Sequence, residues 1–130
     1  MERRETIHAP YGDIAAHEHA MSAPMGQIVR ELSDLLGATT VAAIGGVSET
    51  RAVQQWMGDR APQRPHVLRF ALQLATMIGA SADKQVLRAW FQGGNPHLGD
   101  AAPLTLLRDQ PLEAVQGPLL AAARSFASRR

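Results

Sequence analysis

Apolar residues between positions 25 and 36 recur with the period of an α-helix, and this pattern constrains the fold more than any other feature of the sequence. They fall at i, i+3, i+4, i+7, i+10 and i+11: Met25, Ile28, Val29, Leu32, Leu35 and Leu36. Such a stripe is typical of an amphipathic helix. No segment alternates apolar and polar residues with the period of two that marks a β-strand. The sequence therefore predicts an all-α fold.

Glycine and proline residues divide the remaining chain into further helices, about seven in all. A helix following Pro65 is apolar around most of its girth, which predicts a central position. Ser48 and Ser81 are expected to cap the helices that follow them. Pro118 has no N–H to donate, so the last helix should kink or restart there.

Three regions are expected along the chain. Residues 1–21 contain scattered charges and histidines without an apolar period and are predicted to form a flexible tail. In that tail His17 and His19 are too few to hold a metal alone. Residues 22–78 are predicted to form a helix-turn-helix lobe, and residues 79–130 a small C-terminal helical module.

Several classes of function lack the residues they need. The chain has no cysteine, no HExxH motif and no phosphate-binding glycine loop, so neither catalysis, a metal nor a cofactor is expected. No run of eighteen apolar residues and no apolar stretch behind the charged N-terminus is present, which predicts a cytoplasmic protein.

Charge is distributed unevenly. Residues 1–47 hold three basic and six acidic side chains, a net charge of −3, whereas residues 48–130 hold ten basic and six acidic side chains, a net charge of +4. A basic second part is compatible with a nucleic-acid surface and equally with an ordinary solvated one.

Residues 39–58 have the pattern of a short helix, a glycine turn and a second helix, the arrangement that presents a helix to the major groove of DNA. Val53 and Trp56 are expected in the core, although any three-helix lobe contains such a helix pair. Arg and Gln side chains form bidentate bonds with base edges. The candidate DNA-binding residues, with two arginines for phosphates, are Ser48, Thr50, Arg51, Gln54, Gln55, Arg60 and Arg64.

The segment Val47-Ser-Glu-Thr-Arg-Ala-Val-Gln-Gln-Trp56, followed by Gly58, Pro62 and Arg64, resembles the Xre-type helix-turn-helix of the Xre/MbcA/ParS antitoxins. The interval from Gly46 to Trp56 is one residue longer than in the commonest pattern of that group. The resemblance therefore leaves open the register of the side that would face DNA.

The C-terminal part carries a second pattern: Leu87-Arg-Ala-Trp-Phe91, Asn95-Pro, Leu98-Gly, Pro103-Leu and Leu106-Leu, closing with Ala121 to Phe126. It resembles the toxin-binding module of the same group. These residue types also serve packing and turns, so a structural role stays open beside the binding role. The residues that the resemblance implies as toxin contacts are Trp90, Phe91, Asn95, Leu98, Leu107, Arg124, Ser128, Arg129 and Arg130.

The resemblance implies an antitoxin that binds a RES-type, NAD-consuming toxin and covers the entrance of its active site, with operator DNA as a second partner. A homodimer is expected because helix-turn-helix proteins read paired half-sites. A stand-alone transcription regulator and a scaffold for another protein are the alternatives.

Overall fold

The computed structural model describes the backbone of residues 4–129 and the side chains of residues 13–129. This part of the chain contains eight α-helices, a short 3₁₀-helix and no strand, which confirms the all-α prediction. The helices are α1 (Arg4–Ser22), α2 (Met25–Leu36), α3 (Ala38–Ile44), α4 (Thr50–Met57), α5 (Pro65–Gly79), α6 (Lys84–Gln92), η1 (Pro96–Leu98), α7 (Pro103–Asp109) and α8 (Leu112–Ser128). No described helix combines the length and the apolar character needed to cross a membrane.

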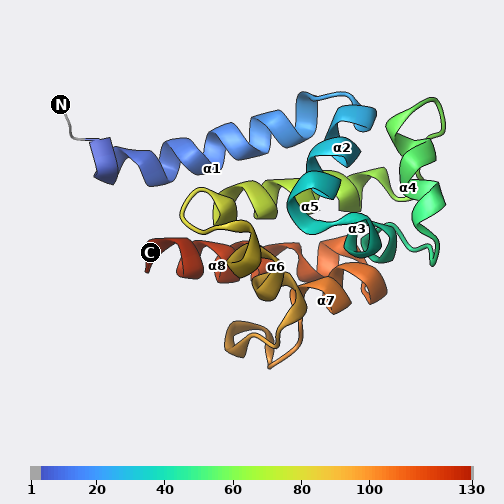
Figure 1. Cartoon of the computed structure of the whole chain (residues 1–130). Helices are drawn as coiled ribbons and strands as arrows, with labels where there is room; N and C mark the ends of the chain where they lie inside the picture. The colour runs from blue at the N-terminus through green and yellow to red at the C-terminus, as the bar shows by residue number, and fades with distance from the viewer. Residues whose placement is uncertain (1–3, 130) are drawn as a thin grey trace.

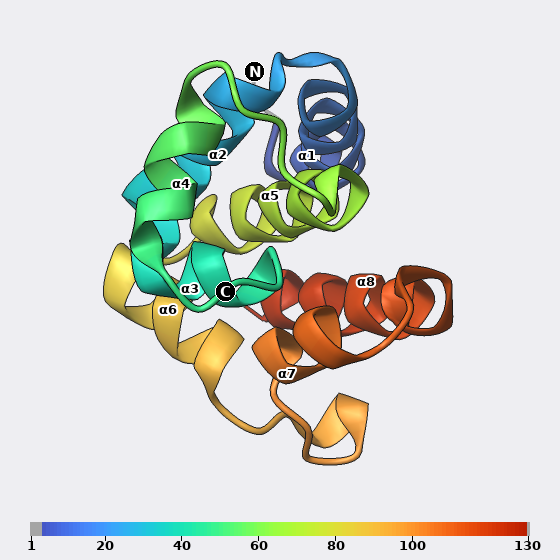
Figure 2. The ribbon, with the colours of Figure 1, turned by 90° about the vertical axis from the view of Figure 1, so that its right-hand side faces the viewer.

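Three long helices lie one above another, with α1 on one side of α5 and α8 on the other (Figure 1). Turning the molecule by 90° shows α2, α3 and α4 grouped beside α5, and α7 beside α8 (Figure 2). The buried apolar residues form one cluster that extends from Ala16 in α1 to Ala123 in α8. The two expected lobes thus share a core.

Helix α5 is central, as its composition predicts. It packs against α1, α2, α3, α6 and α8. An apolar surface around most of the helix allows such a position, because most of that surface is covered by other helices. Ten of its fifteen residues are buried: Val67, Leu68, Phe70, Ala71, Leu72, Gln73, Leu74, Ala75, Met77 and Ile78.

The N-terminal region differs from its prediction, because residues 4–22 form a helix rather than a flexible tail. Helix α1 packs on α5, and the buried side chains of its described part are small, namely Ala16 and Ala20, with the buried Ala23 just after the helix. Small residues permit close approach of two helices but bury little apolar area. A pattern search for large apolar residues therefore misses α1.

Two predicted helix caps are also wrong. Ser48 lies outside α4, whose N-cap is Glu49 and which has no side-chain cap bond. Helix α6 is capped by Asp83 rather than Ser81, with Asp83 Oδ1 accepting a hydrogen bond from the N–H of Val86 at 3.0 Å. Aspartate and serine accept this bond about equally well, so residue type alone could not show whether Ser81 or Asp83 would cap α6.

Helix α8 continues through Pro118 instead of restarting there. The side chain of Pro118 is exposed, so its ring lies on the solvent side of the helix. The apolar side of α8 is anchored in the core by Val115, Leu119, Ala122 and Ala123. Tertiary packing of that apolar side offsets the missing backbone hydrogen bond.

Candidate binding surfaces

Helices α3 and α4 are joined by the five residues 45–49, and both pack on α2. Val53 and Trp56 are buried, as predicted, with Trp56 only 6% exposed. A Cβ atom at Gly45 would collide with the Trp56 ring, so glycine allows α3 and α4 to approach closely. The tryptophan therefore fixes the angle at which α4 leaves the turn.

The opposite side of α4 is polar and exposed. We define the α4 surface as the exposed candidates on this helix and its flanks: Ser48, Thr50, Arg51, Gln54, Gln55 and Arg60. The burial of Val53 and Trp56 fixes which side of α4 faces solvent. Two acids in the same segment, Glu49 and Asp59, balance its two arginines, so residues 48–60 together have no net charge.

Arg64 does not join this surface, which corrects its predicted role at a phosphate. Its guanidinium donates hydrogen bonds to the carbonyl groups of Ile44 at 2.9 Å, Leu107 at 2.9 Å and Arg108 at 3.2 Å. These carbonyls belong to the C-terminal ends of α3 and α7, where the helix leaves them without partners. Arg64 thus ties two helix ends together.

Three other arginines bind helix ends in the same way. Arg30 donates to the carbonyl of Met57 at the end of α4 at 3.3 Å. Arg88 donates to the carbonyls of Leu35 and Asp34 at the end of α2, at 2.9 and 3.3 Å. Positive charge at a helix C-terminus also interacts favourably with the helix dipole. Much of the arginine content therefore serves packing between helices.

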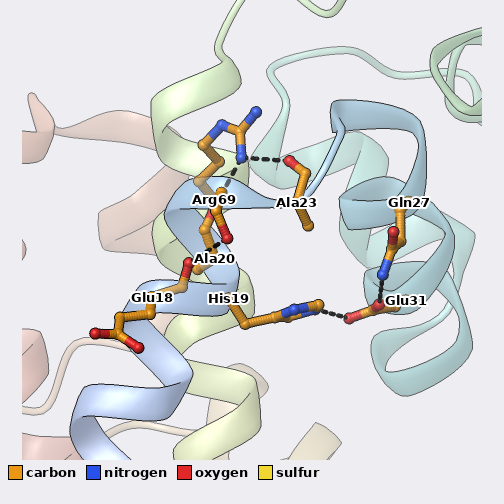
Figure 3. Close-up of polar contacts among 8 residues, drawn as sticks. Glu18, His19, Ala20, Ala23, Gln27, Glu31 and Arg69 are labelled. Carbon is orange, nitrogen blue, oxygen red and sulfur yellow. Dashed lines mark hydrogen bonds and ion pairs between the residues drawn. The ribbon is translucent and has the colours of Figure 1, made fainter.

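Arg69 is the fourth arginine of this kind, and it fixes α1. Its Nη1 donates to the carbonyls of Ala20 at 2.9 Å and Ala23 at 2.8 Å (Figure 3). The two histidines considered for a metal have other partners: His17 Nδ1 binds Gln73 Oε1 at 3.2 Å, and His19 Nε2 binds Glu31 Oε1 at 2.8 Å. No cluster of metal-ligating side chains exists among the described residues.

The carboxylates of Glu31 and Asp109 have lowered pKa values. Burial alone would raise the pKa of Glu31, but its hydrogen bonds with Gln27 and His19, together with the charge of His19, hold that pKa below the usual value. At the end of α7, the two hydrogen bonds from Arg108 lower the pKa of Asp109. Both shifts have local structural causes, and neither carboxylate lies beside a candidate nucleophile.

Three of the predicted toxin contacts are core residues, which corrects their assignment to a binding surface. Trp90 is 9% exposed, Phe91 is fully buried and Leu107 is 1% exposed. The rings of Trp90 and Phe91 meet edge to face with centroids 5.2 Å apart, a favourable geometry for aromatic pairs. These side chains hold α6 and α7 in place and are not accessible to a partner.

The loop after α6 is ordered by its own backbone. Asn95 Oδ1 accepts a hydrogen bond from the N–H of His97 at 2.9 Å, the capping role that its amide predicts. Gly99 adopts a φ of 63°, a left-handed conformation that favours glycine. Leu98 is half-buried and packs against the core. Asn95 and Leu98 therefore stabilise the conformation of the loop, and their side chains do not project into solvent as binding groups.

The exposed candidates that remain lie near the end of α8. We define the α8 surface as Arg124, Ser128 and Arg129, all exposed; Arg130 lies outside the described residues. Arg124 Nε donates to Asp13 Oδ2 of α1 at 2.7 Å. Ser125 Oγ and His97 Nε2 share a hydrogen bond of 3.1 Å, which joins this end of α8 to η1.

One open hollow of about 400 Å³, which sequence patterns did not indicate, lies where α5 and α8 begin. Its walls are residues 63–67 and Leu112, Glu113 and Gln116. Arg64 in that wall is already bonded to helix ends, and Glu113 places a negative charge beside His66. Arg64 in that wall therefore serves the packing of helix ends before it could serve a ligand.

Neither a family model, nor a curated protein, nor a solved structure matches this chain. The functional argument therefore rests on the chain's own residues and on their positions in the fold.

Proposed function

We propose that this chain is an antitoxin that binds a RES-type toxin through the α8 surface and operator DNA through the α4 surface. The observation that carries the proposal is the placement of the two surfaces. Helix α4 lies at one end of the molecule and the C-terminal end of α8 lies at the other (Figures 1 and 2). Two large partners can therefore bind at once without collision.

In the proposed DNA complex, α4 enters the major groove. Arg51 and Gln54 carry the side chains best suited to bidentate bonds with guanine and adenine, and Arg60 holds a phosphate. Because residues 48–60 together have no net charge, general attraction to DNA is weak, and base contacts supply the specificity beside the phosphate contact of Arg60. A homodimer presents two such helices to paired half-sites.

In the proposed toxin complex, the guanidinium groups of Arg124 and Arg129 bind acidic groups near the toxin's active-site entrance. Arginine forms strong bidentate bonds with carboxylates. The sequence resemblance over residues 87–126 supports the assignment of Arg124, and Arg129 follows at the end of the same helix. In this proposal Trp90, Phe91 and Leu107 support the surface from within, because a rigid core keeps α7 and α8 in position.

Co-expression with the product of the neighbouring gene, followed by purification of the complex, tests the proposal. Arg51→Ala should abolish operator binding in a mobility-shift assay and leave toxin binding intact, whereas Arg129→Ala should weaken toxin binding and leave operator binding intact. Failure of a RES-like neighbour to co-purify contradicts the proposal. Loss of both activities in either variant contradicts the separation of the two surfaces.

A stand-alone transcription regulator is the second candidate, because every residue of the α4 surface is exposed while three predicted toxin contacts are buried. It predicts a site-specific complex with upstream DNA when no other protein is present. Binding measured at two salt concentrations should show a negative salt dependence. Absence of a specific complex at low salt contradicts this candidate.

A further inference from the structure

We propose that Arg64 is a positioning residue for the α4 surface: it holds the turn between α3 and α4 against the end of α7, and so sets the angle at which α4 enters the major groove. This inference rests on the proposed DNA contact of the α4 surface and deepens it. It also gives α7, a helix outside the helix-turn-helix, a part in DNA recognition.

The direction of α4 depends on the turn before it. Helix α4 has only eight residues, and within the described chain no side-chain cap fixes its first turn. A short helix is marginal by itself and takes its position from packing. Trp56, near the last turn of α4, packs closely on Gly45. At the first turn, where Arg51 lies, the angle therefore depends on how residues 45–49 are held.

Arg64 completes the hydrogen bonding of this turn. The N–H groups of residues 45–47 bind the carbonyls of residues 41–43, and the carbonyl of Ile44 accepts a hydrogen bond from Arg64 Nη1 at 2.9 Å. A Cβ atom at Gly46 would lie 3.2 Å from Arg64 Cδ, so the stem of the arginine lies against the turn. Because Ile44 precedes α4 and Arg64 follows it, their contact fixes the chain on both sides of α4.

The same guanidinium is fixed at the end of α7. Its Nη2 donates to the carbonyl of Leu107 at 2.9 Å, and its Nη1 also donates to that of Arg108 at 3.2 Å. Leu107 is buried, so this end of α7 is anchored in the core. Helix α3 packs on both α4 and α7 (Figure 2). Arg64 therefore holds the turn before α4 against a helix end that is itself anchored.

This role requires the planar fork of arginine. Its terminal nitrogens point in fixed directions and reach carbonyls on two helices, whereas lysine has a single ammonium group on a flexible stem. A phosphate contact makes no such demand, because lysine also binds phosphate as a point charge. Arg64→Lys keeps the charge of the chain and removes the geometry, so it separates a positioning role from a phosphate contact.

Binding of Arg64→Lys to a DNA duplex from the region upstream of the gene tests the inference. A bidentate contact between arginine and guanine contributes about 5–150-fold to specificity. Tilting α4 should lose part of that contact, so binding to the upstream duplex should weaken by about 3–10-fold. Binding to a duplex of scrambled sequence depends mainly on charge and should not change.

Arg88→Lys is the matched control. Arg88 donates to the carbonyls of Leu35 and Asp34 at the end of α2, so the substitution removes the same kind of contact away from the turn before α4. It should leave both DNA affinities unchanged at a temperature where circular dichroism shows both variants folded. Upstream binding by Arg64→Lys equal to that of the wild type, or an equal loss in Arg88→Lys, overturns the positioning role and leaves the α4 surface standing.

Hydrogen exchange in the free chain tests the contact without DNA. Arg64→Lys should accelerate exchange about 3–10-fold at the amides of Gly46 and Val47 in the turn, and at that of Gln110 at the end of α7. Acceleration on only one side shows that Arg64 does not hold the turn to α7 and overturns the inference. If the wild type binds the upstream and scrambled duplexes equally, the proposed DNA contact itself is wrong, whatever the exchange shows.

Discussion

Helices α1 and α8 both lie along α5, but they are attached to it in different ways. Helix α8 buries Val115 and Leu119 in the shared core. Among the described residues 13–22 of α1, the buried side chains are those of Ala16 and Ala20, and hydrogen bonds of Arg69, His17 and His19 fix this part of the helix. The contrast shows that a helix can be docked by small residues and polar contacts as well as by an apolar stripe.

The two modes of attachment should respond to different perturbations. Apolar burial depends on the shape of the core and only weakly on pH or on a single donor. A helix fixed by a few polar contacts should loosen locally when one donor is removed, while the rest of the fold persists.

Truncation of the apolar anchor of α8 should have the largest effect. Leu119→Ala removes a fully buried side chain, and the cavity should lower the free energy of unfolding by about 2–5 kcal/mol. Denaturant unfolding measures this loss. Leu120→Ala, at a half-buried neighbouring position, is the control and should cost clearly less. Equal losses in the two variants would show that α8 is not oriented by Leu119.

Removal of the arginine that holds α1 should have the next largest effect. Arg69→Gln loses two hydrogen bonds to carbonyl groups, and bonds of this charged kind contribute about 1.5–3 kcal/mol. Hydrogen exchange should show the loss of protection concentrated in residues 16–22. Arg60→Gln, an exposed position, should leave stability within about 0.5 kcal/mol. Uniform loss of protection along the chain would contradict the local attachment of α1.

The sequence predicts α8 and most of the core but not α1, and the contrast between the two helices explains why. Periodicity detects large apolar side chains, so it identifies α2, α5 and the buried face of α4. It has no signal for Ala16, Ala20 and Ala23, whose burial depends on a close approach to α5. Nor does it identify Arg69 as a structural residue, because its carbonyl partners lie 46 and 49 positions away.

The candidate surfaces show the same limit. The side chains of the α4 surface are exposed where the helical period places them, opposite Val53 and Trp56. In the C-terminal part, residue type misled the prediction, since Trp90 and Phe91 serve packing. Arg64 has the positive charge of a residue that binds phosphate, but its guanidinium donates hydrogen bonds to helix-end carbonyl groups, such as that of Leu107, which lie far along the chain. A sequence motif identifies residues with a role in the protein, but it does not show whether a residue packs in the core or contacts a partner.

A smaller effect of opposite sign is expected within α8. Pro118 lies inside the helix and is exposed, so Pro118→Ala restores a backbone donor without disturbing the core. The gain in the free energy of unfolding should be about 1–2 kcal/mol, because the greater freedom of the unfolded chain offsets part of the benefit. Thermal unfolding measures it. A destabilised variant would show that the proline ring supports the packing of α8.

The smallest effect should come from the acid that binds His19. The pKa of Glu31 is lowered in the folded chain, so between its usual value of 4.5 and the lowered value the unfolded chain binds more protons than the folded one. The stability that Glu31 contributes is therefore complete above pH 4.5 and is lost as the pH falls through the lowered pKa.

Unfolding of the wild type and of Glu31→Gln, measured across this acidic range, should give free energies that differ above pH 4.5 and converge below it. Glu18→Gln makes the same charge change on α1 without touching the His19 contact, and it should follow the wild type. Because His19 joins α1 to α2, convergence should coincide with faster hydrogen exchange in α1 and not in α8. Equal acceleration in both helices would mean that the two are released together, and the difference between their modes of attachment would then have no consequence for stability.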